Sequence, residues 1–503
     1  MNGNTSLSRT GGGKVLILLL LFALALFNFK SAGITGLMLV CMVPLVVLLI
    51  MLTLRYKMFL FTVLMVVNYY IMFLAREGFL FLPISLHTEV IELALITVAI
   101  IDAREGKGEN IYNMLLFTLI VWCVFCTIEI LNDACGIGIN AYAWYTGARL
   151  MAFQLLYAFI VCAVYINSPK RVLFFTLLWC GMALFAVFWI WKQQYVGLTS
   201  AEKFYVLTNR PAIVNGRIRY FATFSDGASC GCHMACAAIA FLAIAISNKI
   251  NYLRVIFAIA GLLCVWAFFC TGTRTAIICF IFGMGIYIVL SKNIRIFLPI
   301  AIVMGLFVCF LAFTNIGQGN YNIRRMRSAF RSDDASLNVR DINKAALAKY
   351  MVDVPWGIGI GIEQGDVPPY NKFKVVTEIP PDSEYVYIWV RTGVVGISLF
   401  VTLTVIMFLG ACYVVFFRIR NPSLRGIGAA YTCAFAAIQL GGYANQILMQ
   451  FPNVLIFYGG LTIVYLLPNI DDEYTAYEAS LIEKDAAARA WVKRLVKKYK
   501  PTL

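Results

Sequence analysis

Residues 172–191 read "VLFFTLLWCGMALFAVFWIW", a continuous apolar stretch without a charged side chain. A helix of this length rises about 30 Å, which equals the thickness of the hydrocarbon core of a bilayer. Backbone groups in lipid must be hydrogen-bonded within the spanning structure, and an unbroken apolar run of this length is typical of a helix. The stretch therefore predicts a membrane-spanning helix.

The composition of the whole chain extends this prediction. The 503 residues are 61% hydrophobic and 13% charged, and the mean hydropathy is +0.82, which is outside the usual range of soluble domains. We expect an all-α, polytopic membrane protein with about 14 transmembrane helices. The expected spans are 14–30, 34–54, 57–74, 88–102, 113–131, 147–166, 172–191, 228–247, 252–270, 274–291, 295–313, 384–417, 426–448 and 452–469.

The first of these spans resembles a signal peptide, because an apolar run follows basic residues. No small-residue cleavage site follows it, and many further spans come after it. We therefore predict that residues 14–30 form the first transmembrane helix. The fifteen cysteines lie mostly within apolar segments, so they do not indicate a disulfide framework.

Lysine and arginine in short loops predict the orientation, because positively charged loops stay in the cytoplasm. With the N-terminus inside, six basic loops become cytoplasmic: 55–57, 102–110, 167–171, 247–254, 291–295 and 418–425. The predicted organisation is a cytoplasmic N-terminus (1–13), eleven spans (14–313), a large external loop (314–383), three spans (384–469) and a cytoplasmic tail (471–503). We expect the tail to be an amphipathic helix with acidic residues first and basic residues last, lying in solvent or on lipid, or docking a partner.

The external loop 314–383 is too long for a simple connection. Its stretch "NVRDINKAALAKYMVDVP" predicts an amphipathic helix that ends at Pro355, and "GIGIG" follows. This glycine pattern lacks the strand and helix of a dinucleotide-binding fingerprint. We expect these glycines to let the backbone approach a ligand or a helix closely.

Arginines gather in the segments expected outside. Arg217 and Arg219 precede the span 228–247 together with Asp226, Arg274 opens the span 274–291, and Arg340 lies in the external loop. An arginine carries a rigid fork of donors that fits phosphate oxygens in pairs. These residues predict a pyrophosphate ligand, although a single arginine at a membrane boundary can equally reach lipid phosphates or pair with an acid.

The stretch "PPDSEYVYIWVRTGVVG" (380–396) begins a span with charged residues. Asp382 and Glu384 stand at its entrance, where they can cap the helix and favour its dipole, or bind and activate an acceptor. Arg391 lies inside the span and needs a partner or a water-filled cavity. Glu129 is a conceivable partner.

The stretch "SCGCHMAC" contains residue types that bind soft metals, namely Cys230, Cys232, His233 and Cys236. On a helix, His233 points away from the face that Cys232 and Cys236 share. We therefore predict packing of small residues here and no metal site. The second histidine of the chain, His87, is expected in an outer loop.

The order of four motifs resembles the O-antigen ligase and Wzy polymerase superfamily. These motifs run from Arg219 to Phe224 ("RYFATF"), from Thr271 to Ala276 ("TGTRTA"), from Arg340 to Gly361, and from Asp382 to Gly396. The resemblance covers roughly residues 210–400. Ligases of this family commonly have "HNxY" where this chain has "DSEY", so that Asp382 replaces a histidine and Ser383 an asparagine.

The resemblance implies a multi-pass glycosyltransferase of the bacterial inner membrane that acts in lipopolysaccharide biosynthesis, with its active site on the periplasmic side. Such enzymes transfer a glycan from undecaprenyl diphosphate without a nucleotide sugar, metal or other cofactor, and without nucleic acid. On this basis we expect Arg219, Arg274, Arg217 and Arg340 to bind the pyrophosphate. Asp382 or Glu384 would be the base, and the remaining substrate contacts would come from Tyr385, Asp226 and Arg391.

The acceptor is left open by the sequence. Lipid A core would make the protein a ligase, a second lipid-linked glycan would make it a polymerase, and a protein hydroxyl would make it an O-oligosaccharyltransferase. A flippase or another transporter of lipid-linked oligosaccharide is the alternative outside the superfamily. Transporters, however, usually show internal repeats around a site at the membrane midplane, whereas the polar residues of this chain gather on one side.

Overall fold

The structure is a computed structural model that describes residues 51, 55–80, 84–104, 111–209, 212–214, 216–330 and 335–498. The chain divides into two units between Val63 and Leu64. Everything described below from Leu64 onward lies in the second unit, which holds the candidate site. The described part of the first unit includes the beginning of α2.

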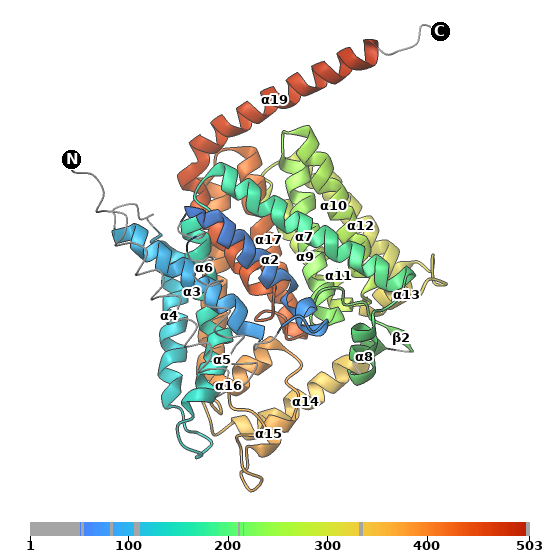
Figure 1. Cartoon of the computed structure of the whole chain (residues 1–503). Helices are drawn as coiled ribbons and strands as arrows, with labels where there is room; N and C mark the ends of the chain where they lie inside the picture. Colours follow the sequence, from blue (N-terminus) through green and yellow to red (C-terminus); the bar gives the residue numbers. More distant parts are fainter. Residues whose placement is uncertain are drawn as a thin grey trace, which may run out of the picture. The chain divides into compact units, whose positions relative to one another are not determined.

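Helices make up most of the described residues (Figure 1). From the N-terminal side they are α2 (Lys57–Arg76), α3 (Ile84–Asp102), α4 (Met114–Ile128), η2 (Glu129–Leu131), α5 (Ala141–Ala148), η3 (Arg149–Phe153), α6 (Gln154–Tyr165), α7 (Pro169–Tyr195), α8 (Ser200–Thr208), α9 (Gly227–Ser247), α10 (Asn251–Cys270), α11 (Arg274–Leu290) and α12 (Ile294–Phe313). The chain continues with α13 (Tyr321–Arg327), η5 (Ser328–Phe330), α14 (Ala335–Met351), α15 (Lys374–Glu378), α16 (Glu384–Tyr413), η6 (Val414–Arg418), α17 (Pro422–Ala444), η7 (Val454–Tyr458), α18 (Gly459–Leu466), η8 (Leu467–Ile470) and α19 (Asp471–Lys498).

The all-α, polytopic fold predicted from the sequence is confirmed. Eight helices of the described residues are long and apolar enough to cross a membrane, judged by length and composition. The twelve expected spans from 57–74 onward are helical over most of their length. Span 14–30 and nearly all of span 34–54 lie outside the described residues, so the expected number of 14 spans is not confirmed.

Helix α9 lies at the centre of the second unit, where it packs against α10, α11 and α17. Its sequence "GASCGCHMACAAIAFLAIAIS" is dominated by small side chains, which allow neighbouring helices to approach closely. A Cβ atom added to Gly231 would lie 2.5 Å from Oγ1 of Thr271 and 2.7 Å from Cβ of Thr273. This close packing fixes the turn that precedes α11, where Arg274 begins the helix.

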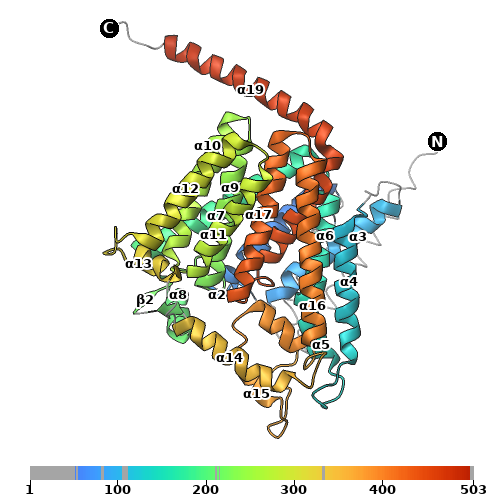
Figure 2. The same ribbon diagram turned by 180° about the vertical axis from the view of Figure 1, so that it is seen from behind.

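The segment 314–383 contains α13, η5, α14 and α15, and its apolar residues form a core together with Cys135, Ala143 and α16. Leu347, Ile358 and Val376 are almost completely buried in that core, and they pack with Val390 of α16. Helix α14 ends at Met351, four residues before the expected end at Pro355. Figure 2 shows α14 and α15 at the end of the helical bundle opposite to α19.

Helix α16 contains a kink at Gly393, whose φ of 66° and ψ of −167° are not helical. The glycine-containing segment after α14 packs against this kink. The N–H of Ile358 donates to the carbonyl of Val390 (2.9 Å), and the N–H of Val395 donates to the carbonyl of Pro355 (3.2 Å). The glycines of "GIGIG" therefore allow the close approach of backbone to a helix, one of the two roles expected for them.

Candidate functional site

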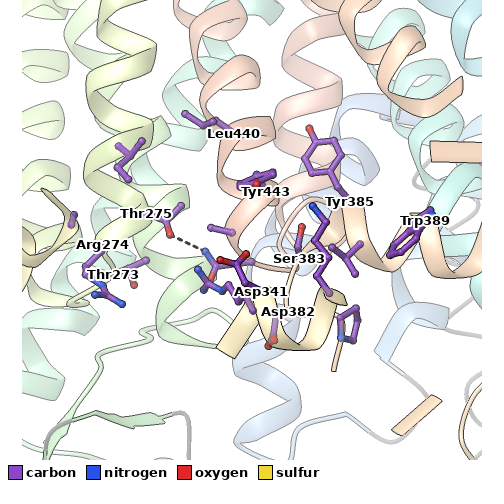
Figure 3. A pocket seen from close by; sticks show the side chains of 18 of the residues that line it. Thr273, Arg274, Thr275, Asp341, Asp382, Ser383, Tyr385, Trp389, Leu440 and Tyr443 are labelled. Carbon is purple, nitrogen blue, oxygen red and sulfur yellow. Dashed lines mark hydrogen bonds between the residues drawn. The ribbon is translucent and has the colours of Figure 1, made fainter. Parts of the chain in front are cut away.

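A cavity of about 460 Å³ lies between α11, α14, the start of α16 and the end of α17 (Figure 3). Five basic side chains and two carboxylates line it. The basic residues are Arg219, Arg274, Arg325, Arg340 and Lys344, and the acidic residues are Asp341 and Asp382. Five of the predicted site residues thus meet at one cavity, although they come from distant parts of the sequence: Arg219, Arg274, Arg340, Asp382 and Tyr385.

Arg219 is held by the turn between α10 and α11. Its Nη2 donates to Oγ1 of Thr273 (2.8 Å), and that hydroxyl donates to the carbonyl of Gly227 (2.6 Å). Nε of Arg219 is buried without a hydrogen-bond partner among the described residues. Burial lowers the pKa of Arg219, and the carboxylate of Asp226 partly opposes this effect. The side chain therefore keeps a donor that is not used by the protein.

The other arginines reach the cavity from separate helices. Arg274 is the first residue of α11, and Figure 3 shows it beside Thr273 and Thr275. Nε of Arg325, in α13, donates to the carbonyl of Gly272 (3.0 Å). The Arg325 side chain is therefore bonded to the turn from which Arg274 begins α11.

Arg340 belongs to a hydrogen-bonded chain that joins three helices. Its Nη2 donates to Oδ1 of Asn445 (3.4 Å), and Nδ2 of Asn445 donates to Oγ1 of Thr275 (3.2 Å), the bond drawn as a dashed line in Figure 3. Asn445 directly follows α17 and is its C-cap residue. The side-chain amide of Asn445 therefore connects Arg340 of α14 to Thr275 in the first turn of α11.

Asp382 lies at the entrance of α16 and has a φ of 54°, in the left-handed region. Its Oδ2 accepts a hydrogen bond from Nδ2 of Asn343 (2.7 Å). The N-cap residue is Ser383, whose side chain makes no capping bond and instead donates to the carbonyl of Gly442 (3.2 Å). Capping of the helix therefore does not account for the position of the Asp382 carboxylate.

The cavity also has apolar lining residues, which come from α11, α16 and α17. These residues are Ile278, Val386, Trp389, Ile397, Leu440, Tyr443 and Ala444. Tyr385 also lines the cavity, and its hydroxyl donates to the carbonyl of Gln439 (3.2 Å). The cavity thus combines cationic and apolar lining residues.

Glu384 does not line this cavity, although it is only two residues from Asp382. Its side chain is 3% exposed, and Oε2 accepts a hydrogen bond from the backbone N–H of Leu448 (3.0 Å). The carboxylate faces the backbone that follows α17. This geometry gives Glu384 a role in anchoring that segment, whereas Asp382 is the carboxylate that faces the cavity.

Two other predicted substrate contacts, Asp226 and Arg391, lie elsewhere. Asp226 caps α9, where Oδ1 accepts from the N–H groups of Ala228 (2.6 Å) and Ser229 (3.0 Å). Arg391 lies over the ring of Tyr387, 5.4 Å from its centroid. No ion pair joins Arg391 to Glu129 in the described structure. Oε2 of Glu129 accepts instead from Nδ2 of Asn132 (2.8 Å).

Arg217 lines a second cavity, of about 550 Å³, that shares Arg219 and Gly272 with the first. Its guanidinium lies 4.7 Å from the ring centroid of Tyr321. Arg217 is in β2 (Arg217–Ile218), which pairs antiparallel with β1 (Ile213–Val214). The hairpin thus places Arg217 next to the main cavity but outside its lining.

Both histidines lie away from the cavity. His233 is fully buried, with its Nε2 accepting from Nε1 of Trp179 (3.1 Å) and its Nδ1 2.8 Å from Oδ1 of Asn453. His87 lies within α3 and not in the outer loop expected from the sequence. No cluster of three or more metal-binding side chains occurs among the described residues.

Several residues of the cavity were not identified as site residues from the sequence. Asp341 and Lys344 are two of them, and they lie on the same face of α14 as the predicted residue Arg340, at positions i+1 and i+4 from it. Helical periodicity could have indicated this face. The roles of Asn343 and Asn445, in contrast, depend on contacts with residues far away in the sequence.

The charges of the cavity define the ligand that it fits. Its lining has five cations against two carboxylates, together with apolar residues. The paired N–H donors of arginine bind phosphate oxygens, and the apolar lining of a pocket can bind a hydrocarbon chain. An anionic ligand with an apolar tail matches both kinds of residue.

Comparison with known protein families identifies the same part of the chain. Residues 259–401 match the family model described as O-antigen ligase. No curated protein matches the chain. The matched segment contains most of the cavity's charged residues, while Arg219 lies before it. Together with the polytopic helical fold, this match supports the membership of the chain in the O-antigen ligase family.

Proposed function

We propose that the protein is a membrane glycosyltransferase of the O-antigen ligase type, which transfers a glycan from undecaprenyl diphosphate to the hydroxyl of an acceptor. The observation that carries this proposal is the cavity in which Arg219, Arg274, Arg325 and Arg340 surround one space together with apolar residues and the carboxylate of Asp382. A polyprenyl diphosphate has the anionic group and the hydrocarbon chain that such a cavity fits.

The arginines would act on the leaving group. As the bond between the anomeric carbon and the diphosphate oxygen breaks, the oxygen keeps the electron pair and its negative charge grows. Fixed cations aimed at this oxygen stabilise the transition state without reorganising. Arg219 retains an unused buried donor at Nε, and this makes it the first candidate for such a contact.

Asp382 would act on the acceptor. The acceptor hydroxyl attacks the anomeric carbon, a new carbon–oxygen bond forms, and the hydroxyl proton passes to the carboxylate. The hydrogen bond from Asn343 would hold the carboxylate in place. Asp382 would thereby perform the task of the histidine that is common in ligases of this family.

The proposed location is the bacterial inner membrane, with both termini in the cytoplasm and the cavity on the periplasmic side. The basic loops support this orientation. We propose lipid A core as the acceptor, in agreement with the O-antigen ligase match. A second lipid-linked glycan or a protein hydroxyl would make the protein a polymerase or a protein glycosyltransferase.

A transfer assay with purified protein in lipid nanodiscs tests the proposal. The protein receives undecaprenyl diphosphate carrying a glycan, together with lipid A core, and released lipid diphosphate is measured. Arg219→Lys and Arg274→Lys keep the positive charge but lose the paired N–H donors of the guanidinium group. Each substitution should therefore lower the transfer rate at least about tenfold. Arg418→Lys is the matched control, since Arg418 is exposed in η6 and should leave the rate unchanged.

The outcomes separate the alternatives. Unchanged rates in both arginine variants would contradict the proposed pyrophosphate site. No release of lipid diphosphate with any of the three acceptors would contradict an enzyme and favour a transporter. In a deletion strain, bare core with retained lipid-linked polymer identifies a ligase, and core capped with one repeat identifies a polymerase.

A further inference from the structure

A separate cavity lies at the other end of the central helices. It has a volume of about 440 Å³, and its basic residues are Lys249, Arg254 and Arg425. No aspartate or glutamate occurs among the described residues that line it. Helix α9 runs from Gly227, near the candidate site, to Ser247 in the wall of this cavity. A helix of this length separates the two cavities by about 30 Å, which is the thickness of a bilayer core.

The positive charge of this cavity is only partly neutralised by the protein. Nζ of Lys249 lies 3.4 Å from Oε2 of Glu478 in α19. The same oxygen also accepts from Nδ2 of Asn421 (2.9 Å). Arg254 and Arg425 form no ion pair with any carboxylate in the described parts of the chain. Two guanidinium groups are therefore available to an anion.

The backbone and a buried amide add to this preference. Helices α10 and α17 begin at the cavity, and Asn293, the N-cap residue of α12, lies in its wall. The N-terminal ends of helices favour anions, while the C-terminal ends of α9 and α11, which also reach the cavity, oppose this effect in part. Asn248 is 3% exposed, and its Oδ1 accepts from the N–H of Ile250 (2.8 Å), which leaves Nδ2 as a donor without a partner in the described structure.

The surface beside the cavity is apolar. On α10, Tyr252 is 42% exposed, Val255 57%, Ile256 41% and Ile259 53%. Exposed apolar side chains on a spanning helix face the hydrocarbon chains of lipids. A ligand bound in the cavity can therefore have its charged group among the arginines and its chains along α10.

We propose that this cavity binds the phosphate of an anionic phospholipid in the leaflet opposite to the candidate active site. Arg254 and Arg425 bind the phosphate oxygens, and the exposed face of α10 contacts the acyl chains. A volume of about 440 Å³ is within the range of sites for small molecules. The proposal is independent of the proposed transferase function, because it rests on a different cavity.

Lipid binding to the purified full-length protein tests this proposal. The delipidated protein is titrated in a neutral detergent with phosphatidylglycerol, with phosphatidylcholine of the same acyl chains, and with inorganic phosphate. Native mass spectrometry counts the bound molecules, and thermal unfolding reports the stabilisation. We expect one bound phosphatidylglycerol molecule, with an affinity at least about tenfold higher than that of phosphatidylcholine. A headgroup with a net negative charge is attracted more strongly by the two arginines than a zwitterionic headgroup.

Two double variants test whether the lipid binds in this cavity. The double variant Arg254→Gln with Arg425→Gln should weaken phosphatidylglycerol binding at least about tenfold. The control Arg418→Gln with Arg420→Gln removes the same charge from exposed positions that follow α16 and should have little effect. Equal losses in both double variants, or no loss in either, would overturn the proposal. Inorganic phosphate that binds alone and displaces no lipid would identify a free anion as the ligand and overturn the assignment to a phospholipid.

Discussion

Asp382 and Glu384 are two residues apart, yet their carboxylates have different surroundings. Asp382 faces the cavity and is bonded by Asn343, whereas Glu384 is buried against the backbone of Leu448. A general base must contact the acceptor hydroxyl, whereas a buried carboxylate that holds a backbone segment must keep its hydrogen bonds. The two carboxylates therefore give two separate predictions.

Asp382→Asn should lower the rate of glycan transfer by about 10²–10⁴-fold, because the amide cannot accept the hydroxyl proton. The KM for the lipid-linked donor should change little, since the arginines bind the diphosphate. Steady-state kinetics in nanodiscs measure both quantities. Asp341→Asn is the comparison, because Asp341 lines the same cavity. A large loss in Asp341→Asn with full activity in Asp382→Asn would show that the base is wrongly assigned.

Glu384→Gln should destabilise the fold rather than change the chemistry. One of its oxygens becomes an NH₂ group, which cannot accept hydrogen bonds from backbone N–H groups, and a bond to a charged group is worth about 1.5–3 kcal/mol. We expect a lower midpoint of thermal unfolding in detergent. Glu483→Gln, at an exposed position of α19, is the control. A midpoint equal to that of the control would contradict the anchoring role.

At the scale of secondary-structure elements, the kink of α16 depends on glycine. A Cβ atom at Gly393 would lie 1.9 Å from the carbonyl oxygen of Pro355, and the φ of 66° strains any larger residue. Gly393→Ala should reduce the yield of folded protein in size-exclusion chromatography. Gly285 has open space around it, so Gly285→Ala in α11 should have no such effect and can stabilise the helix by about 0.5–1 kcal/mol. Normal folding of Gly393→Ala would contradict the packing described for this kink.

Helix α8 is stabilised by a carboxylate whose charge depends on pH. Burial would raise the pKa of Glu202, but hydrogen bonds from the N–H of Thr199 and from Trp189, Gln193 and Lys192 outweigh it and lower the pKa. The stabilisation by Glu202 is therefore fully present at a pH above the pKa that Glu202 has in the unfolded chain. It is lost as the pH falls through the lower pKa of Glu202 in the folded protein.

Thermal unfolding between pH 7 and pH 3 tests this dependence. Glu202→Gln should lower the midpoint at pH 7, and the difference from the unchanged protein should shrink toward pH 3. Glu473→Gln, at an exposed position of α19, controls for the general effect of removing a carboxylate. A difference that is constant with pH would contradict the role of the charged form.

At the scale of the whole molecule, the proposed orientation places the segment 314–383 and α19 on opposite sides of the membrane. Tyr370 is 90% exposed, and Glu483 is exposed in α19. A membrane-impermeant maleimide should label Tyr370→Cys in intact spheroplasts and Glu483→Cys only after permeabilisation. The protein without either substitution is the control, because it shows how much maleimide reacts with the natural cysteines. Labelling in the reverse order would invert the orientation.

The sequence was sufficient to predict the all-α membrane fold, because the length of an apolar stretch is a local signal. It also singled out Arg219, Arg274, Arg340 and Asp382, which the structure brings to one cavity, because arginine fits phosphate oxygens and because the order of the motifs resembles the ligase family. It could not distinguish Asp382 from Glu384, because their difference arises from the segment after α17, more than sixty residues away. The partners Asn343 and Asn445 were missed for the same reason.

The hydrogen bonds between the "GIGIG" segment and the kink of α16 have a consequence for protein engineering. Residues 355–359 supply partners for backbone groups of residues 390–395, and such groups need a partner where water is scarce. The two segments therefore form one exchangeable module. A chimera that replaces the loop of this chain by that of another family member should fold when both segments come from the same parent, and fail when the junction falls between them.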